Sequence, residues 1–360
     1  MRLPPLSGQQ VGRGLLVAAA LVAAVPVTRA VAASVLGDDR DAPARAELVN
    51  VPRRATLGGN LPLDSLLGLS GRLRARLITR DEVKQYPPLV EHFGNSIREP
   101  GIRTVTMVGG HDEFAFITLR PWRDKAGAYV NRYHVGWWPG ERRKMPTNYD
   151  NPIGFIEVTQ ENADVRLSEH FRLRDFLTHD QFQVWPKYLV LREELIDKLE
   201  LVLATLEAQG IPTRHVVVLS GFRTPQYNAR ISFEGAAYAS RHQYGDAADV
   251  IIDANRDGRM DDLNRDGVVD FGDTDVINRA VERVEHQYPE LVGGLGLYHA
   301  MGPSGPFAHI DVRGTRARWV NGGSVARTRP GRTTSRPESR AAVGKCRAEG
   351  EMAALCARVR

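Results

Sequence analysis

Apolar residues recur at helical spacing in two segments of the C-terminal half. In REELIDKLELVLATLEAQG (192–210), leucine and valine return every three or four residues, which places them on one face of a helix. Gly210 and Pro212 are typical stop signals after such a helix. TDVINRAVERVEHQY (274–288) shows the same spacing. The positions that define the two apolar faces are Leu195, Leu199, Val202 and Leu206, and Val276, Ile277, Ala280, Val281 and Val284.

Two short runs near these helices are predicted to be strands. HVVVLSG (215–221) is rich in β-branched residues, as expected for a buried strand, and FAHIDVRG (307–314) is interpreted as a second one. A further helix start is predicted at Ser168, although Phe171 stands where a full capping box has Glu. Helices and strands together indicate an α+β domain over residues 166–322.

The preceding block, residues 73–165, has a different pattern. Its β-prone runs IRTVTMVGG, EFAFITLR, AYVNRYHVGWW and IGFIEVT are separated by Gly, Pro, Asp and Asn. Such short runs with turn residues between them predict a small all-β module. Its aromatic residues are expected to form the core of this module, with a sugar-stacking surface as the alternative. These residues are Tyr129, Tyr133, Trp137 and Trp138.

The N-terminal segment has the order of a secretory signal peptide, expected at residues 1–33. Arg2 and Arg13 precede an uncharged apolar run, and small residues follow it. This run is too short for a hydrocarbon core of ~30 Å, so an uncleaved anchor is the less favoured alternative. We therefore expect a protein that is secreted or resides in the periplasm or cell envelope. Residues 34–72, rich in Arg, Asp, Gly and Pro, are interpreted as a linker.

Composition and charge narrow the class of protein. With 42% hydrophobic and 25% charged residues, the chain has the composition of a globular protein. The net charge of +5 is concentrated in a C-terminal tail, residues 323–360, that includes ARTRPGRTTSRPESR. This tail is predicted to be disordered and either solvated or attracted to an anionic wall or membrane surface. No nucleic-acid partner is expected. Cys346 and Cys356 are predicted to form a local disulfide, the alternative being two free thiols.

Three residues have the composition of a catalytic metal site. His242 precedes Asp249 by seven residues in SRHQYGDAADV, and His309 follows in GPFAHIDVRG. Two imidazoles and one carboxylate leave the fourth position of a tetrahedral zinc site open, as catalytic zinc sites do. Small residues between the first two ligands allow the chain to fold back. These residues are Gly245, Ala247 and Ala248.

The segments SGFRTPQYN, SRHQYGDAADV, GGLGLY and GPFAHIDVRG followed by ARW resemble, in this order, the motifs of a known family. It is the family of zinc D-Ala-D-Ala carboxypeptidases and murein endopeptidases, whose fold is shared with the Hedgehog signalling domain. The resemblance covers about residues 166–320. It implies a Hedgehog/DD-peptidase-like zinc domain at 166–322, preceded by the small all-β module.

The resemblance also implies an activity and roles for particular residues. The expected activity is hydrolysis of peptide stems in peptidoglycan by a carboxypeptidase. The alternatives are a murein endopeptidase and a non-catalytic, metal-bound cell-wall-binding protein. His242, Asp249 and His309 are then expected to ligate zinc. Arg223 is expected to steady a carboxylate or carbonyl oxygen of the substrate, and Ser240, beside the first ligand, is expected to be a second substrate-binding residue.

The general base departs from the family pattern, because GPFA before His309 offers no carboxylate. Asp311 is the expected replacement: on a strand, residues 309 and 311 point to the same face, so Asp311 is expected to take a proton from the attacking water. The alternative role for Asp311 is to orient a metal ligand. His299 is the expected candidate for stabilising the transition state, unless it is an incidental loop residue.

An insertion at residues 253–273 carries two overlapping D-x-N-x-D-G motifs, DANRDGRMDDLN and DLNRDGVVDFGD. In calcium loops, oxygen ligands alternate with spacers and glycine occupies the sixth position. The two motifs resemble the loops of dockerin-type and thrombospondin-type repeats, and they predict calcium as a second cofactor beside zinc. A solvated acidic loop is the alternative. The expected ligands are Asp253, Asn255, Asp257 and Asp261 in the first loop, and Asp262, Asn264, Asp266, Asp270 and Asp273 in the second.

Overall fold

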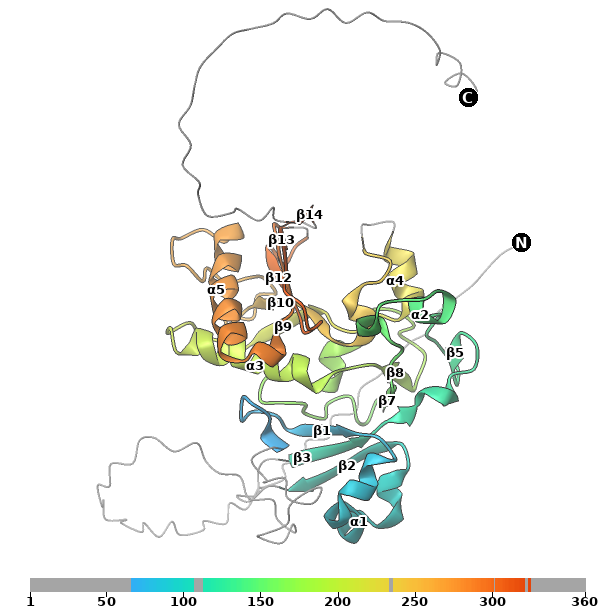
Figure 1. Cartoon of the computed structure of the whole chain (residues 1–360). Helices are drawn as coiled ribbons and strands as arrows, with labels where there is room; N and C mark the ends of the chain where they lie inside the picture. The colour runs from blue at the N-terminus through green and yellow to red at the C-terminus, as the bar shows by residue number, and fades with distance from the viewer. Residues whose placement is uncertain (1–65, 107–112, 233–235, 301, 321–322, 325–360) are drawn as a thin grey trace, which may run out of the picture. The chain divides into compact units, whose positions relative to one another are not determined.

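The structure is a computed structural model (Figure 1), and it contains both helices and sheets, which confirms the α+β class. The expected signal peptide, both cysteines and the basic segment 326–340 lie outside the described residues. Among the helices that are described, none is long and apolar enough to cross a membrane. The described residues are 66–106, 113–232, 236–300, 302–320 and 323–324.

The largest sheet lies within the predicted α+β domain except for its last strand, which falls in the first residues of the segment expected to be a disordered tail. Its strands are β9 (Val216–Ser220), β10 (Ala247–Ile252), β11 (Gly294–Tyr298), β12 (Phe307–Asp311), β13 (Ala317–Val320) and β14 (Gly323–Ser324). They lie side by side in the order β14-β13-β11-β12-β10-β9. Strands β11 and β13 are parallel, and the other neighbours are antiparallel. The strands predicted around residues 215–221 and 307–314 are thus confirmed. Strand β9, however, lies at the edge of the sheet and is only partly buried, whereas a buried strand was expected there.

Both predicted helices are confirmed, as α3 (Glu193–Glu207) and α5 (Phe271–Gln287). The apolar residues predicted to share one face of each helix are buried in the main core. They recur with the period of a helix because that face packs against the rest of the protein. Helix α5 contacts α3, β11 and β12. In Figure 1, α5 lies on one side of the sheet and the short helix α4 (Pro225–Ile231) on the other. One face of the sheet is therefore covered by α5, and the opposite face carries the residues described below.

The helix expected to start at Ser168 is not formed. The segment instead contains a single 3-10 turn, η6 (Leu173–Phe176). Ser168 forms an isolated β-bridge with Leu73, and its hydroxyl accepts a hydrogen bond from the amide of Phe171. The bridge and this local hydrogen bond hold the backbone in a non-helical conformation, so Ser168 does not start a helix although it resembles an N-cap.

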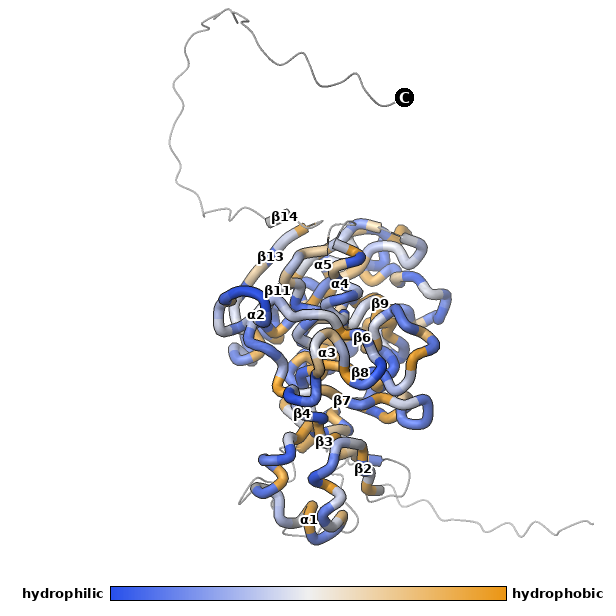
Figure 2. The backbone as a smooth tube through the Cα atoms, turned by 90° about the vertical axis from the view of Figure 1, so that its right-hand side faces the viewer, coloured by the Kyte–Doolittle hydropathy of each residue, from blue (hydrophilic) through white to orange (hydrophobic). Residues whose placement is uncertain are grey.

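The block 73–165 is not all-β, because α1 (Pro87–Phe93) and the short α2 (Pro139–Arg142) lie within it. A three-stranded sheet, in which β3 (Glu113–Thr118) lies between β1 (Ala75–Ile78) and β2 (Gly101–Thr106), packs with α1 in a small core of its own. Much of β3 is coloured as hydrophobic in Figure 2. The strands of the block and its continuation are β1 (Ala75–Ile78), β2 (Gly101–Thr106), β3 (Glu113–Thr118), β4 (Arg120–Pro121), β5 (Tyr129–Val130), β6 (Tyr133–His134), β7 (Gly154–Val158) and β8 (Lys187–Leu189).

A second, larger core joins this block to the α+β domain. It contains Phe155 and Trp138 from the block together with Leu195 of α3 and Ile310 of β12. Sheet β4-β7-β8 also crosses the expected boundary near residue 165. The two expected domains are therefore joined by this larger core, and the small core around α1 lies beside it.

The end of the expected linker is packed rather than exposed. Leu66 is buried in the small core, and the backbone amides of Leu69 and Ser70 donate hydrogen bonds of 2.6 and 2.8 Å to Asp197. Residues 66–72 are therefore part of the folded structure, which corrects the expected linker boundary at 72. Residues 34–65 lie outside the described residues.

The aromatic residues of the block divide into two pairs. Tyr133 and Trp138 are buried in the core, as expected for a module interior, whereas Tyr129 and Trp137 remain 46% and 43% exposed. The remaining helical segments are the 3-10 turns η2 (Glu82–Gln85), η3 (Gly94–Arg98), η4 (Trp122–Asp124), η5 (Thr147–Tyr149), η8 (Arg241–Tyr244) and η9 (Pro289–Leu291).

Candidate metal centre

One row of directly paired residues crosses five strands of the large sheet. Ser220 of β9 pairs with Asp249 of β10, which pairs with His309 of β12. His309 pairs in turn with Gly296 of β11, and Gly296 with Trp319 of β13. Because directly opposed residues point to the same face of a sheet, these side chains share the face away from α5. Strand register thus brings together residues that lie far apart in the sequence.

His242 reaches this row from the 3-10 turn η8, which precedes β10. Gly245 ends that turn with φ of +67°, and a Cβ at this position would overlap the carbonyl of Val190. A residue without a side chain is therefore required for the chain to turn back from His242 into β10. Ala247 and Ala248, also expected to allow this turn, are buried in the strand that follows.

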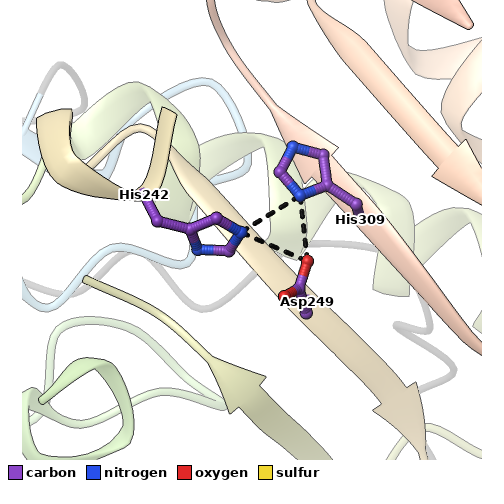
Figure 3. Close-up of side chains that lie close together, drawn as sticks. All are labelled: His242, Asp249 and His309. Atoms are coloured by element: carbon purple, nitrogen blue, oxygen red, sulfur yellow. Dashed lines mark hydrogen bonds and ion pairs between the residues drawn. The ribbon is translucent and has the colours of Figure 1, made fainter. Parts of the chain in front are cut away.

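The three predicted ligands meet at one point (Figure 3). His309 Nδ1 lies 2.9 Å from Asp249 Oδ1 and 3.2 Å from His242 Nε2, and His242 Nε2 lies 3.3 Å from Asp249 Oδ1. All three residues are buried, and they could hold a metal ion. Among the described residues, no other group of three His, Cys, Asp or Glu side chains is placed to do so.

Each of the three side chains is held from behind by a further group. The Nδ1–H of His242 donates a 2.7 Å hydrogen bond to the carbonyl of Gly221, and the Nε2–H of His309 donates one of 3.1 Å to Asp311. The outer oxygen of Asp249, Oδ2, accepts a 2.7 Å bond from Arg223. These bonds leave the lone pairs of His242 Nε2, His309 Nδ1 and Asp249 Oδ1 facing the common point, as second-sphere partners of metal ligands do.

The charges around this point favour a cation. Burial and the charge of Arg223 lower the pKa of His242 to about 4, so its imidazole is neutral at pH 7. Burial opposes charge on His309, but hydrogen bonds to Asp249 and Asp311 outweigh it and raise its pKa. Burial also opposes charge on Asp249, yet the two histidines hold its pKa well below the ordinary value. The group therefore offers an ionised carboxylate beside a neutral imidazole, and a bound cation would balance the negative charge of Asp249.

Asp311 lies on the same sheet face as His309, as strand alternation predicts, but not where a general base is needed. Its carboxylate contacts His309 through Nε2, the ring nitrogen turned away from the common point. It is fully buried and also accepts hydrogen bonds from Gly294 and Arg313. Burial would raise its pKa, but His309 and Arg313 lower it further than burial raises it. This placement favours the alternative role, in which Asp311 orients His309.

Arg223 lies beside the three ligands and is already engaged. Its Nη2 donates to Asp249, and its Nε donates a 2.7 Å hydrogen bond to the hydroxyl of Ser220. The arginine thus orients a ligand, and only part of its guanidinium remains for a substrate oxygen. Ser240 is buried immediately before η8, close in sequence to His242.

His299 does not join this group. Residues 296 and 298 of β11 face the ligand side, so residue 299 continues toward the opposite side. There its ring stacks on Phe271, the first residue of α5, with a centroid distance of 4.3 Å and an interplanar angle of 20°. The expectation that His299 stabilises a transition state is therefore not supported by its position.

Two aromatic residues not predicted as site residues lie beside the ligands. The ring of Trp319 is 5.1 Å from that of His309, and its Nε1–H donates a 2.8 Å hydrogen bond to the hydroxyl of Tyr298. Gly296 provides the space, because a Cβ there would overlap the indole. The segments GGLGLY and ARW contain these residues, but only the pairing of β11 with β13 shows that they meet.

The two predicted calcium loops have the same local structure. Arg256 and Arg265, at the fourth position of each loop, have φ of 65° and 62°. In each loop the first and third residues accept hydrogen bonds from the amide at position five, and the first residue also accepts one from the glycine at position six. The repeated sequence motif is therefore a repeated conformation.

Most carboxylates of these loops accept hydrogen bonds from backbone amides. Asp261 accepts a hydrogen bond from Ala254, and Asp273 accepts bonds from Leu263, Asn264 and Asp270. Asp270 caps α5 by accepting from the amide of Gly272. Asp253 and Asp273 are buried, whereas the other expected ligands are partly or fully exposed.

Comparisons with known proteins identify no relative. No family model, curated protein or solved structure matches this chain. The site is therefore interpreted from its own geometry and from the sequence motifs described above.

Proposed function

We propose that the protein is an exported zinc metallopeptidase that hydrolyses peptide bonds in the peptide stems of peptidoglycan, as a D-Ala-D-Ala carboxypeptidase. One observation carries this proposal: His242, Asp249 and His309 converge with their lone pairs inward while Gly221, Asp311 and Arg223 hold them from outside. The resemblance of four ordered motifs to the Hedgehog/DD-peptidase fold family suggests the substrate class.

The donor set supports zinc as the metal. Bonds of about 2.0–2.1 Å in a tetrahedral site separate neighbouring donor atoms by roughly 3.3 Å. The three distances here are 2.9, 3.2 and 3.3 Å. Two imidazoles with one carboxylate suit zinc better than calcium or magnesium, which prefer oxygen ligands alone. When bound, zinc would activate water and polarise the scissile carbonyl.

The surrounding residues have separate tasks in this proposal. Asp311 fixes the ring of His309 and makes it more basic, and Arg223 fixes the carboxylate of Asp249. The remaining N–H groups of Arg223 would bind a substrate oxygen. The proton taken from water would leave through a group other than Asp311, because that carboxylate lies behind His309.

Product analysis tests the proposal. The zinc-loaded protein is incubated with purified muropeptides, and the products are identified by mass. Loss of a terminal D-Ala supports the carboxypeptidase, and conversion of crosslinked dimers into monomers supports the alternative of a murein endopeptidase. A chelator and the substitution His242→Ala should each abolish either product. Unchanged muropeptides, bound by a zinc-loaded protein, would instead favour a non-catalytic wall-binding protein.

Calcium is proposed as a second, structural cofactor in the two loops. Their D-x-N-x-D-G spacing and their shared backbone conformation support this assignment. Calcium would bind there only in the folded protein and so stabilise the insertion that separates β10 from α5. Attraction of the basic tail to an anionic wall or membrane surface is part of the same proposal.

A further inference from the structure

Tyr298 stands on the ligand face of the sheet and is held rigidly there. In β11 it lies two residues beyond Gly296, the residue opposite His309, and it pairs with Phe307 of β12. Its ring stacks on that of Phe307, with a centroid distance of 4.5 Å and an interplanar angle of 4°. The tyrosine is partly exposed.

The hydroxyl of Tyr298 is directed back toward the ligands. It accepts the 2.8 Å hydrogen bond from Trp319 Nε1. That nitrogen lies over Gly296, because a Cβ at Gly296 would overlap the Nε1 edge of the indole. Gly296 is the direct neighbour of His309 across the strand pair. The hydroxyl is therefore held above the row that contains His309 and Asp249.

The hydrogen of this hydroxyl remains able to donate to another group. An indole N–H is a donor only, so the tyrosine oxygen is the acceptor in the bond with Trp319. Burial raises the pKa of Tyr298 by more than the hydrogen bond from Trp319 lowers it, and the charge of Asp249 raises it further against a smaller opposing effect of Arg223. The phenol is therefore protonated at neutral pH.

We propose that Tyr298 is a further catalytic residue, whose hydroxyl donates a hydrogen bond to the oxygen of the scissile carbonyl as negative charge develops there. This inference rests on the proposed peptidase function. In the hydrolysis, the water oxygen bonds to the carbonyl carbon, the carbon–nitrogen bond breaks, and the proton from water passes to the leaving amine. Tyr298 keeps its own proton throughout and acts only as a donor. Arg223, which already donates to Asp249 and Ser220, leaves room for this second donor.

Tyr298→Phe tests the proposal, because it removes one oxygen atom and keeps the stacked ring. For muropeptide hydrolysis we expect kcat to fall about 100-fold, as for loss of one oxyanion donor, with KM changed less than about twofold. Zinc content should remain stoichiometric. Tyr288→Phe is the matched control, because the hydroxyl of Tyr288 is held by Gln287 at the end of α5. Trp319→Phe, which removes the bond that positions the hydroxyl, should give a smaller loss of kcat. A kcat for Tyr298→Phe equal to that of the control would overturn the proposal.

A binding measurement separates this inference from the choice of substrate. Inorganic phosphate, a tetrahedral anion, is titrated into the zinc-loaded protein by calorimetry. Tyr298→Phe should weaken phosphate binding by about tenfold, because a hydrogen bond to a charged group is lost. Equal dissociation constants for wild type and variant, or no phosphate binding by the wild type, would contradict the donor role. If the wild type cleaves no muropeptide, the proposed function fails, while the phosphate titration still decides the role of Tyr298.

Discussion

The ligand face of the large sheet and the insertion at residues 253–273 both gather acidic residues, but they prepare them differently. On the sheet, Asp249 has one oxygen held by Arg223, and its other oxygen faces two imidazoles. In the insertion, most carboxylate oxygens accept hydrogen bonds from the backbone amides of the same loops. On the sheet, the free lone pairs of the three side chains point toward one place. In the insertion, the lone pairs of the carboxylates accept the hydrogen bonds that maintain the loop conformation. Whether a group of side chains is arranged to bind a metal thus depends on the hydrogen bonds that hold the atoms facing away from the site, and not on the number of carboxylates.

The largest expected effect comes from removing a ligand on the sheet face. His242→Ala should abolish stoichiometric zinc in elemental analysis, because the remaining imidazole and carboxylate cannot complete the site. His286→Ala, at an exposed histidine of α5, is the control and should keep its zinc. Retention of zinc by the His242 variant would show that the metal binds elsewhere.

Asp311→Asn separates the two roles considered for this residue. If Asp311 orients His309, zinc affinity should fall about 10- to 100-fold, as for other second-sphere partners. A competition titration with a chromophoric chelator measures this change, and a thermal melt checks that the variant is folded. Wild-type zinc affinity combined with a large loss of turnover would restore the role of general base.

Zinc affinity should also depend on pH, with a sign set by His309. Its raised pKa means that the zinc-free site keeps a proton on this imidazole to a higher pH than an ordinary histidine does. Zinc must displace that proton, so affinity should rise with pH and level off above the raised pKa. Below it we expect a change of about tenfold per pH unit, since one proton is released and His242 is already neutral. Affinity that is independent of pH from about pH 6 to about pH 9 would contradict this account.

The smallest expected effect concerns the insertion. Calcium should raise the melting temperature of the zinc-loaded protein by several degrees, because it binds only the folded loops. Asp266→Ala should remove most of that response, whereas Asp150→Ala, at an exposed acidic residue outside the loops, should preserve it. If the melting temperature of the wild type does not respond to calcium, the loops are acidic turns whose carboxylates only accept hydrogen bonds from the protein.

The sequence predicted the elements well where one periodicity dominated. The apolar faces of α3 and α5, the strands β9 and β12, and the convergence of His242, Asp249 and His309 agree with the structure. Residues 66–72 were predicted less well, because Leu66 is buried by contacts with residues distant in the chain.

The roles of side chains around the ligands could not be predicted in the same way. Alternation correctly placed Asp311 on the face of His309, but which ring nitrogen it contacts depends on where Asp249 lies in the neighbouring strand. The sequence likewise could not show that Tyr298 faces the ligands and His299 faces α5, because that follows from the register of β11 with β12. Register is a tertiary property, and a shift by one residue reverses every side chain.

The most direct test of this account is anomalous diffraction at the zinc absorption edge from crystals of the zinc-loaded protein. We expect one strong peak bounded by His242 Nε2, His309 Nδ1 and Asp249 Oδ1, at bond lengths of about 2.0–2.2 Å, and no comparable zinc peak in the loops of residues 253–273. A peak in those loops, or none among the three ligands, would contradict it.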